Sequence, residues 1–586
     1  MIKLDKYLLK VDNPAQYLGN ELNSIHKKEY KTHMAIVYPD LYEVGMSSLA
    51  IRILYGAVNS VDGVYMERAF SPKVDMEEFL RKDGVPLFSI ETKTPLKKFD
   101  AIGFSLAYEM TYTNFLNILD LSEIPFERKE RGEEYPIIIA GGTGAYNPKV
   151  LEKFVDVFMI GEGEESIKEV AEILRDNSDK SKLEKLQFLS KIEGVYVPEI
   201  YNGQKIKKRI VKDLNKIEVK ETNIVPYTSI VHNRLAYEVQ RGCTRGCRFC
   251  QAGVIYRPVR ERSIESVKEK VTCGIMESGY NEVSLASLSS SDYSVIDEVI
   301  DKILSDHKEE NLSISLPSLR IEKHSVDTAL KVESGRKTGF TFAPEAGSQR
   351  MRDVINKGVT EDDIMETAKA AFEQGWKHVK FYFMIGLPFE TLEDVAEIYN
   401  LAKKVLDMGR RIDKGINITV SVSNFVPKLN TPFQWEKQMG YSEMEEKHGY
   451  LRELFRQERR LTLKIHEREI SYLEGIISRG DERIADVIKR AWELGAKFDG
   501  WREHFRFDLW KKAMLDCGID EEYYMGARDL DAKLPWDFID CGVSKEYMME
   551  ERENAIKEVL TRDCRNGCTN CGACPSLDAK MVIIKK

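Results

Sequence analysis

Short apolar runs alternate with amphipathic stretches over the first 180 residues of the chain. Met34 to Tyr38 is apolar throughout, and further short runs follow at 64–70, 87–91, 101–107, 136–140 and 156–160. Between several of these runs, hydrophobic residues recur at helical spacing, at 46–58, 75–82, 111–121 and 164–174. Strands and helices in alternation predict a parallel, doubly wound α/β sheet.

A second and more regular alternation begins near residue 234. Strand-like runs occupy 235–240, 282–288, 312–317, 339–343, 378–385 and 417–423. Helical stretches between them include 263–278, 293–306, 361–374 and 391–408. These β/α units predict a partial, open (β/α)6 barrel of the TIM type, with functional residues at the C-terminal ends of its strands.

Beyond Trp435 the pattern changes to helices. Residues 442–472 are rich in Glu, Lys, Arg and Leu, and 481–494 and 545–560 are amphipathic. With 586 residues, the chain is too long for one hydrophobic core. We therefore expect a Rossmann-type sheet domain, a linker, the barrel and a mainly helical region with a cysteine-rich tail, at 1–180, 181–232, 233–435 and 436–586.

The composition is that of an ordinary globular protein, with 42% hydrophobic and 31% charged residues. The formal net charge of -9 argues against a generally basic nucleic-acid binder. No apolar run reaches the length of a membrane span, and the start of the chain lacks the apolar core of a signal peptide. We expect a cytoplasmic protein without a membrane partner.

Three of the ten cysteines fall within eight residues, at Cys243, Cys247 and Cys250. Thiolates at this C-x3-C-x2-C spacing can wrap one face of an iron–sulfur cube and leave one iron open to a small molecule. A zinc site would need a fourth ligand, and no Cys or His lies close by in the sequence to supply it. In a cytosolic protein, clustered cysteines indicate metal rather than disulfides.

The stretch from Gly242 to Gly253 resembles the cysteine loop of the radical S-adenosylmethionine (SAM) superfamily, whose C-x3-C-x-aromatic-C pattern it matches through Phe249. The resemblance implies a catalytic [4Fe–4S] cluster on the three cysteines, which reduces SAM to methionine and a 5′-deoxyadenosyl radical. It also implies a reductant protein of the flavodoxin or ferredoxin type as a partner. The core fold that it implies is the partial barrel.

The loops after the early barrel strands hold the first candidate contacts to SAM. Ser289 lies in the polar loop 287–293, in the region where many members of the superfamily carry Gly-Gly-Glu. That motif is absent here, so other groups must hold the SAM amino group. Arg320 and Arg352 could clamp the methionine carboxylate through paired hydrogen bonds.

Further candidates follow the later strands. Glu345 could accept hydrogen bonds from the ribose hydroxyls, and Phe249 could pack on the adenine. Gly386 belongs to a Gly-Leu-Pro-Phe-Glu-Thr turn that resembles the superfamily turn behind the adenine pocket. Each of these positions also has a plainer interpretation as a helix cap, a surface ion pair or a structural turn.

Loops at the strand ends of the N-terminal sheet resemble those of the cobalamin-binding domain, which is flavodoxin-like. Its D-x-H-x-x-G motif occurs here with Tyr42 in place of the histidine, and a Gly-Glu-Gly-Glu turn at 161–164 resembles the end of that domain. A tyrosine is a poorer cobalt ligand than a neutral imidazole, so histidine-ligated cobalamin is not expected. The plainer interpretation is that the glycines merely join strands to helices. The resemblance implies these cobalamin contacts: Asp40, Tyr42, Gly45, Ser105, Gly141 and Gly142.

Two groups of basic residues leave alternatives open. Arg248, Arg257, Arg260 and Arg262 lie in or just after the cysteine loop. They suit an anionic substrate or a cofactor phosphate, or they pair with acids of the N-terminal domain. The basic segment 205–212 is either a solvated strand or linker, or a contact to RNA.

The chain ends with four more clustered cysteines. They follow C-x3-C-x2-C-x2-C spacing over eleven residues, at Cys564, Cys568, Cys571 and Cys574. Four thiolates suit zinc or a second [4Fe–4S] cluster. Because all four lie in one loop, without the two separate knuckles of many zinc sites, the spacing favours iron–sulfur.

Taken over its length, the chain resembles an uncharacterised branch of the cobalamin-binding-domain-containing radical SAM family. The first functional hypothesis is a cobalamin-dependent enzyme that methylates or otherwise modifies an unactivated carbon. The second is a radical SAM enzyme with a vestigial cobalamin domain, acting on RNA or protein with help from the tail cluster. The third is a non-enzymatic iron–sulfur sensor or assembly protein.

Overall fold

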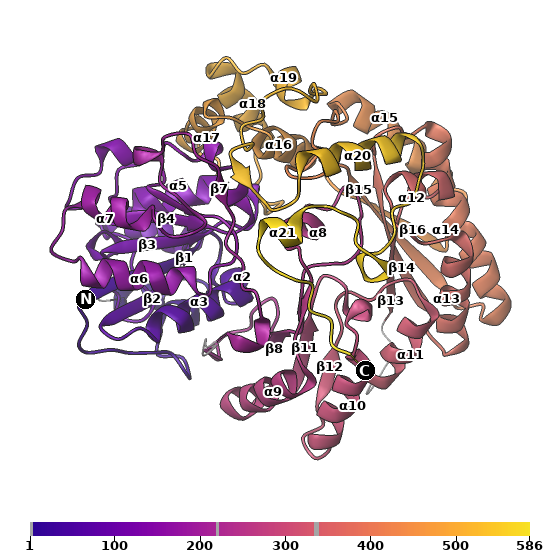
Figure 1. Ribbon diagram of the computed structural model, residues 1–586, viewed down its shortest axis with the longest axis horizontal. Helices are drawn as coiled ribbons and strands as arrows, with labels where there is room; N and C mark the ends of the chain where they lie inside the picture. The colour runs from indigo at the N-terminus through magenta and orange to yellow at the C-terminus, as the bar shows by residue number, and fades with distance from the viewer. Residues whose placement is uncertain (1–3, 218–221, 333–338, 586) are drawn as a thin grey trace.

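Figure 1 shows the computed structural model of the chain, which describes residues 4–217, 222–332 and 339–585. The N-terminal sheet domain, in indigo and purple, lies beside the barrel, in magenta to orange. C-terminal helices lie across the top of both, and the yellow final segment runs back between them to the C-terminus. None of the helices in the described ranges combines the length and apolar character that a membrane span requires.

The N-terminal sheet has the flavodoxin-like strand order β2-β1-β3-β4-β5, with all five strands parallel. A short strand, β6 (Val195–Tyr196), pairs antiparallel with β5 at the edge. The strand expected at 87–91 is wrong: Phe88 makes only an isolated bridge to Pro95. The parallel strands are β1 (Thr32–Tyr38), β2 (Val64–Phe70), β3 (Ala101–Ser105), β4 (Ile137–Gly141) and β5 (Val157–Met159).

Helices cover both faces of this sheet. Met34 and Ile36 of β1 join the core beneath α3 (Leu49–Asn59) and α6 (Ser166–Asp176). Their neighbours Ala35 and Val37 join the core on the opposite face, with α4 (Val74–Asp83) and α5 (Tyr112–Leu121). Because both faces are buried, β1 is apolar at four consecutive positions, Met34 to Val37, rather than at alternate ones.

The barrel consists of two arcs of parallel strands, β12-β11-β8 and β13-β14-β15-β16. Among the described residues no backbone ladder joins β12 to β13, so the barrel is partial, as predicted. The predicted strands are β8 (Leu235–Glu238), β11 (Glu282–Ala286), β12 (Ser313–Ser315), β13 (Phe340–Glu345), β14 (His378–Ile385) and β15 (Asn417–Asn424). The helices between them are α9 (Ile264–Ser278), α10 (Ile296–Asp306), α11 (Lys323–Val332), α13 (Glu361–Glu373) and α14 (Leu392–Ile412).

A further strand interrupts the stretch that was expected to be helical at 442–472. It follows α15 (Tyr441–Phe455), spans Leu461–Ile465 as β16, and pairs parallel with β15. Its sequence alternates Leu, Thr, Leu, Lys and Ile, so that Leu461, Leu463 and Ile465 lie on the side of the barrel core. The uniform helix predicted there is therefore wrong.

The C-terminal helices tie the two sheet regions together. They are α16 (Arg468–Ser478), α17 (Arg483–Glu493), α18 (Phe507–Asp516) and α20 (Lys545–Ile556). Asp499, between α17 and α18, accepts hydrogen bonds from Thr113 of α5 at 2.5 Å and from Trp510 of α18 at 3.0 Å. These contacts anchor the helical region on the N-terminal domain.

Candidate functional site

The cysteine loop follows the first barrel strand through the short β9 (Gln240–Arg241) and ends at α8 (Ala252–Ile255). Gly242 opens it at φ +83°, and a Cβ there would lie 2.5 Å from the carbonyl oxygen of Tyr256. Only glycine fits this close approach. At the other end, the Gly253 N–H donates to the Sγ of Cys250 at 3.3 Å.

A cavity of about 920 Å³ opens at the cysteine loop, between the β12 and β13 arcs. This volume is within the ~300–1,000 Å³ typical of small-molecule sites. Sequence-predicted residues from four loops meet there: Cys243, Cys247, Phe249, Cys250, Ser289, Arg320 and Glu345. The structure therefore brings together all three cysteines and four of the six residues expected to contact SAM.

The donor set of three cysteines fits an iron–sulfur cluster, whose irons take thiolate ligands. No three Cys, His, Asp or Glu side chains within the described ranges converge on one metal position. The thiolates of an iron–sulfur cube bind different irons, so their sulfurs need not converge in this way. Burial raises the pKa of Cys243 to about 12 and that of Cys250 to about 11, so the metal-free loop holds thiols that must lose protons on loading.

Lys357 is a cavity residue that the sequence did not single out. Its Nζ donates to Glu345 Oε1 at 3.1 Å, and its ammonium lies near Cys247. Burial favours the neutral amine, but Glu345 and Cys247 together outweigh this and raise the lysine pKa. The cavity thus holds cations from Arg320 and Lys357 beside the cysteine loop.

Two residues that were predicted to contact SAM do not line the cavity. Arg352 is fully buried, and its guanidinium donates to the carbonyl oxygens of Ala346, Gly347 and Val359. It therefore braces the loop after β13. Gly386, at φ +78°, packs against Met439, where a Cβ would approach within 2.2 Å. A role for either in SAM binding would have to be indirect.

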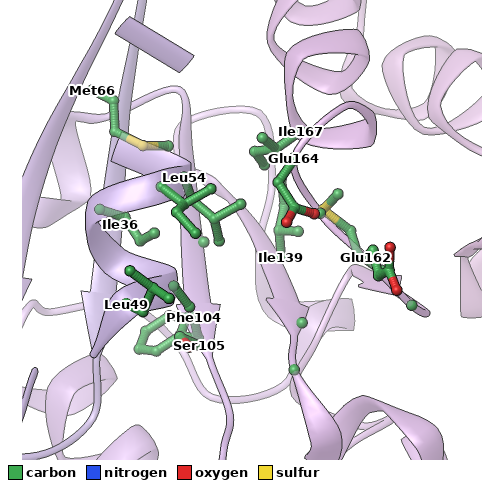
Figure 2. A pocket seen from close by; sticks show the side chains of 18 of the residues that line it. Ile36, Leu49, Leu54, Met66, Phe104, Ser105, Ile139, Glu162, Glu164 and Ile167 are labelled. Atoms are coloured by element: carbon green, nitrogen blue, oxygen red, sulfur yellow. The ribbon is translucent and has the colours of Figure 1, made fainter. Parts of the chain in front are cut away.

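A second pocket of about 330 Å³ lies in the N-terminal domain at the strand ends that face the barrel. Ser105, Gly141 and Gly142 line it, as does the turn 161–164. Figure 2 shows apolar side chains of α3 and the sheet on one side and two glutamates on the other. Its lining is mainly apolar: Ile36, Leu49, Ile53, Leu54, Met66, Ile139 and Met159.

The other three predicted cobalamin contacts lie outside this pocket. Tyr42 is only 2% exposed and donates from its hydroxyl to Glu21 at 2.8 Å, and burial raises its pKa. Gly45 packs against the ring of Phe70. Asp40 accepts a hydrogen bond from the Trp501 indole at 2.8 Å. Tyr42 is thus a neutral core phenol that does not line the pocket.

The four arginines of the cysteine loop and its continuation are engaged inside the protein. Arg260 makes a paired contact with Glu162 at 2.7 and 2.9 Å, joining the barrel to the N-terminal domain. Arg248 pairs with Glu551 of α20 at 3.1 Å. Arg257 and Arg262 are also buried and donate to backbone carbonyls. Among these contacts, the Arg260–Glu162 pair is the expected pairing with an acid of the N-terminal domain, whereas Arg248 pairs with a C-terminal helix.

The basic segment 205–212 is also paired or buried in large part. Lys208 is 1% exposed and donates to the carbonyl oxygens of Ile255 and Arg257. Arg209 bonds two glutamates of the α6 region, and Lys212 pairs with Asp578. Nothing in these contacts distinguishes the segment as a surface for RNA.

The four-cysteine tail lies against the cysteine loop. The backbone N–H of Cys564 donates to the carbonyl oxygen of Thr244 at 3.2 Å. Cys571 is buried, Cys568 is exposed, and Cys564 and Cys574 are half-buried. Burial raises the pKa of the Cys564 thiol, Arg257 lowers it, and the nearby thiols of Cys571, Cys568 and Cys574 raise it further.

Comparison with known proteins agrees with this geometry. The sequence model described as "Radical SAM superfamily" matches residues 237–402, and that described as "Radical SAM proteins, N-terminal" matches residues 50–198. An uncharacterised protein of Methanocaldococcus jannaschii is 30% identical over 415 residues, which make up 69% of this chain and 80% of that protein. The chain belongs to the radical SAM superfamily, a class of enzymes.

Two more distant relatives are named for particular activities. An uncharacterised methyltransferase of Pyrococcus horikoshii is 24% identical over 47% of this chain and 60% of its own length. A threonylcarbamoyladenosine tRNA methylthiotransferase of Aquifex aeolicus is 24% identical over 48% and 63%. The chain thus spans less than two thirds of either. The solved structure of the cobalamin-dependent SAM radical enzyme OxsB aligns with a TM-score of 0.48 and 14% identity, over 93% of this chain and 83% of that one.

Proposed function

We propose that the protein is a cobalamin-dependent radical SAM enzyme that modifies an unactivated carbon. Methylation is the modification that we propose first. The observation that carries this proposal is the apolar pocket of about 330 Å³ in the flavodoxin-like domain. It lies at the C-terminal strand ends, where ligands of such sheets bind. Glu238, Arg241 and Tyr256 complete it from the barrel side, so a ligand held there faces the radical site.

The pocket fits part of cobalamin well. Its apolar walls suit the flat aromatic base of the cobalamin nucleotide, and the strand-end glycines leave room for a bulky ligand near the backbone. Ser105, Gly141 and Gly142 are the predicted residues that would hold it. Cobalamin, when bound, supplies a transferable methyl group. Because Tyr42 is buried and paired with Glu21, the chain would bind cobalamin without that side chain on the cobalt.

The large cavity supplies the SAM site in this proposal. Arg320 and Lys357 offer cations to the methionine carboxylate, and Glu345 offers an acceptor to the ribose. Phe249, held beside Cys250, offers an aromatic face to the adenine. The cluster and SAM together would supply the 5′-deoxyadenosyl radical, and the cavity residues would hold SAM against the cysteine loop.

Cobalamin retention after anaerobic mixing tests the proposal. Ala50 is exposed at the pocket on α3, so Ala50→Trp places a bulky ring there without opening the core. Glu172→Trp, at an exposed position of α6 away from the pocket, is the matched control. We expect the wild type and the control to co-elute with hydroxocobalamin on gel filtration and Ala50→Trp to lose most of it. Wild-type protein that carries no cobalt would contradict the proposal.

A second candidate has its own support. The burial of Tyr42 and the contact between the tail and the cysteine loop favour a radical SAM enzyme with a vestigial cobalamin domain, which modifies RNA or protein with help from a tail cluster. Such an enzyme would cleave SAM without binding cobalt. A reductant of the flavodoxin or ferredoxin class would serve either enzyme.

A further inference from the structure

The tail is joined to the cysteine loop by direct bonds at the residue beside Cys243. Thr244 accepts a backbone hydrogen bond from Cys564 at 3.2 Å, and its hydroxyl donates to Asp563 Oδ2 at 3.0 Å. The Cα atoms of Cys243 and Cys564 therefore lie within about 11 Å of each other. This upper limit adds the backbone distances from Cys243 to the Thr244 carbonyl oxygen, the hydrogen bond, and the N–Cα bond of Cys564. The two groups of cysteines are therefore neighbours, although more than 300 residues separate them in sequence.

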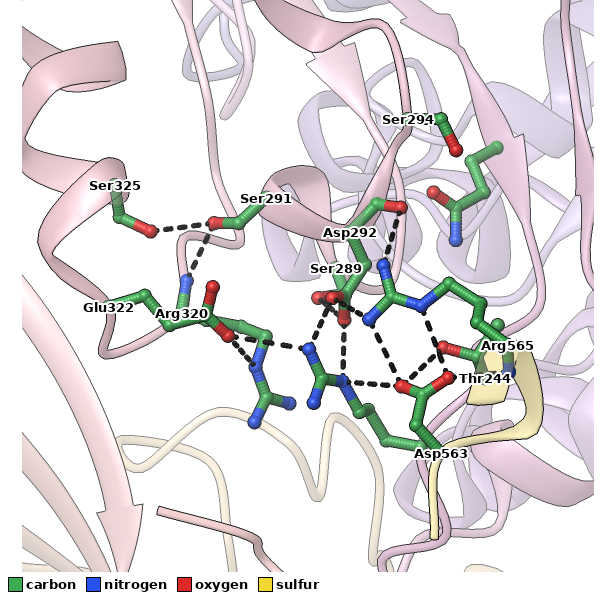
Figure 3. Close-up of polar contacts among 12 residues, drawn as sticks. Thr244, Ser289, Ser291, Asp292, Ser294, Arg320, Glu322, Ser325, Asp563 and Arg565 are labelled. Carbon is green, nitrogen blue, oxygen red and sulfur yellow. Dashed lines mark hydrogen bonds and ion pairs between the residues drawn. The ribbon is translucent and has the colours of Figure 1, made fainter. Parts of the chain in front are cut away.

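Asp292 forms a second connection, shown in Figure 3. Its side chain is 2% exposed and accepts hydrogen bonds from Arg245 of the cysteine loop at 2.6 and 3.1 Å and from Arg565 of the tail at 2.7 Å. Burial alone would raise the pKa of Asp292, but the guanidinium groups of Arg245 and Arg320 hold it well below its ordinary value. A permanently charged carboxylate thus joins the loop to the tail, and Ser289 donates to the same group at 2.7 Å.

Arg257 is the third connection, and it points to a ligand. Its guanidinium donates to the carbonyl oxygens of Gly253 and Arg245 in the cysteine loop. Burial lowers the pKa of Arg257, but the nearby Tyr547 hydroxyl and Cys571 thiol raise it above its ordinary value. The residue is 7% exposed, yet its Nη1 makes no hydrogen bond of good geometry. A buried cationic donor without an acceptor is costly, and a negatively charged metal–sulfur group at Cys571 would supply one.

The spacing of the four tail cysteines indicates which kind of metal group they hold. Zinc sites with four cysteines commonly pair two separate C-x-x-C knuckles, whereas Cys564 to Cys574 supplies all four thiols from one eleven-residue loop. Runs of closely spaced cysteines are typical of iron–sulfur clusters. A hydrogen bond from Arg257 to such a cluster would also stabilise its reduced, more negative form.

We propose that the tail cysteines hold a second iron–sulfur cluster, which passes electrons to the cluster at Cys243, Cys247 and Cys250 across the Thr244–Cys564 contact. Exposed Cys568 marks the side on which a donor approaches. A carrier of the flavodoxin class is oxidised by one electron, the tail cluster takes up that electron and releases it, and the first cluster is reduced by one electron. No atom or proton is transferred. The proposal rests on the radical SAM chemistry and is independent of cobalamin.

The experiment compares two reductants by stopped-flow absorbance and by electron paramagnetic resonance. Cys568→Ala/Cys574→Ala removes tail ligands, and Cys517→Ala, outside both groups, is the matched control. Titanium(III) citrate, a small reductant, should reduce the first cluster in every variant. Reduced flavodoxin should do so rapidly in the wild type and the control but not in the tail variant. The reduced wild type should also show broadened signals from two interacting clusters.

The opposite results are equally clear. Zinc in the tail, with iron for only one cube in the wild type, would overturn the proposal, as would equal rates of reduction by flavodoxin in all variants. If the double variant loses the first cluster, a second variant, Thr244→Val/Asp563→Asn, keeps every cysteine. It removes the side-chain hydrogen bond that helps to hold the tail against the cysteine loop, so it should slow reduction by flavodoxin but not by titanium(III) citrate. Failure of the wild type to cleave SAM with titanium(III) citrate would instead count against the radical SAM activity.

Discussion

Replacing Glu162 with Gln tests how the sheet domain is held against the barrel. Glu162 is 7% exposed, accepts hydrogen bonds from Arg260 at 2.7 and 2.9 Å, and forms an ion pair with Arg241 at 3.0 Å. Arg241 keeps Glu164 and Glu238 after the substitution, but Arg260 has no other carboxylate partner in the described part of the chain. One buried cation is then left uncompensated, and breaking such a pair costs about 3–5 kcal/mol.

Urea denaturation of the metal-free protein, followed by circular dichroism, measures this cost. Glu162→Gln should lower the free energy of the first unfolding transition by about 3 kcal/mol or more. The control Glu238→Gln removes a more exposed carboxylate and should cost about 1 kcal/mol or less. Adding Arg260→Met to Glu162→Gln should recover part of the loss, because no unpaired charge remains. A Glu162→Gln protein as stable as the control would refute the reasoning.

Three other substitutions test separate contacts. Burial raises the pKa of Asp499 from 3.8 to about 6, so the folded state binds a proton more tightly than the unfolded chain. Stability should therefore fall as the pH rises through this window, by about 3 kcal/mol, and urea denaturation of Asp499→Asn should show no such fall. Lys357→Met removes the cation beside Glu345 and should weaken SAM binding in equilibrium dialysis, whereas Lys357→Arg should retain most of it. Gly161→Ala puts a Cβ 2.1 Å from the Arg209 carbonyl oxygen at φ +107°, and should cost more than about 1 kcal/mol in thermal unfolding. Unchanged values would contradict each expectation.

Most of the fold follows from local pattern. The strand predicted at 378–385 is β14 with the same bounds, because its whole length lies between two helices with clear amphipathic spacing. The strand β16 was missed because its five residues stand between charged stretches that favour a helix. The apolar run 87–91 is buried without being a strand, because its backbone bonds go to separate partners.

The part of the site that the sequence predicts well is the part in which the spacing of cysteines within one loop determines which group can bind. Cys243, Cys247 and Cys250 meet at one cavity, as their motif predicts. Arg352 was a plausible SAM contact by position, but a long side chain can turn either way, and this one turns into its own loop. The connection through Asp292 could not be read from the sequence, because its partners come from loops far apart along the chain.

The formation of 5′-deoxyadenosine tests the radical SAM chemistry most directly. The protein would be reconstituted anaerobically with iron and sulfide, reduced with titanium(III) citrate, and supplied with SAM, and the products would be quantified by mass spectrometry. The wild type and Cys517→Ala should release 5′-deoxyadenosine and methionine in equal amounts, and Cys247→Ala should release neither. Wild-type protein that holds its iron but leaves SAM intact would contradict the assignment and favour a non-enzymatic iron–sulfur sensor.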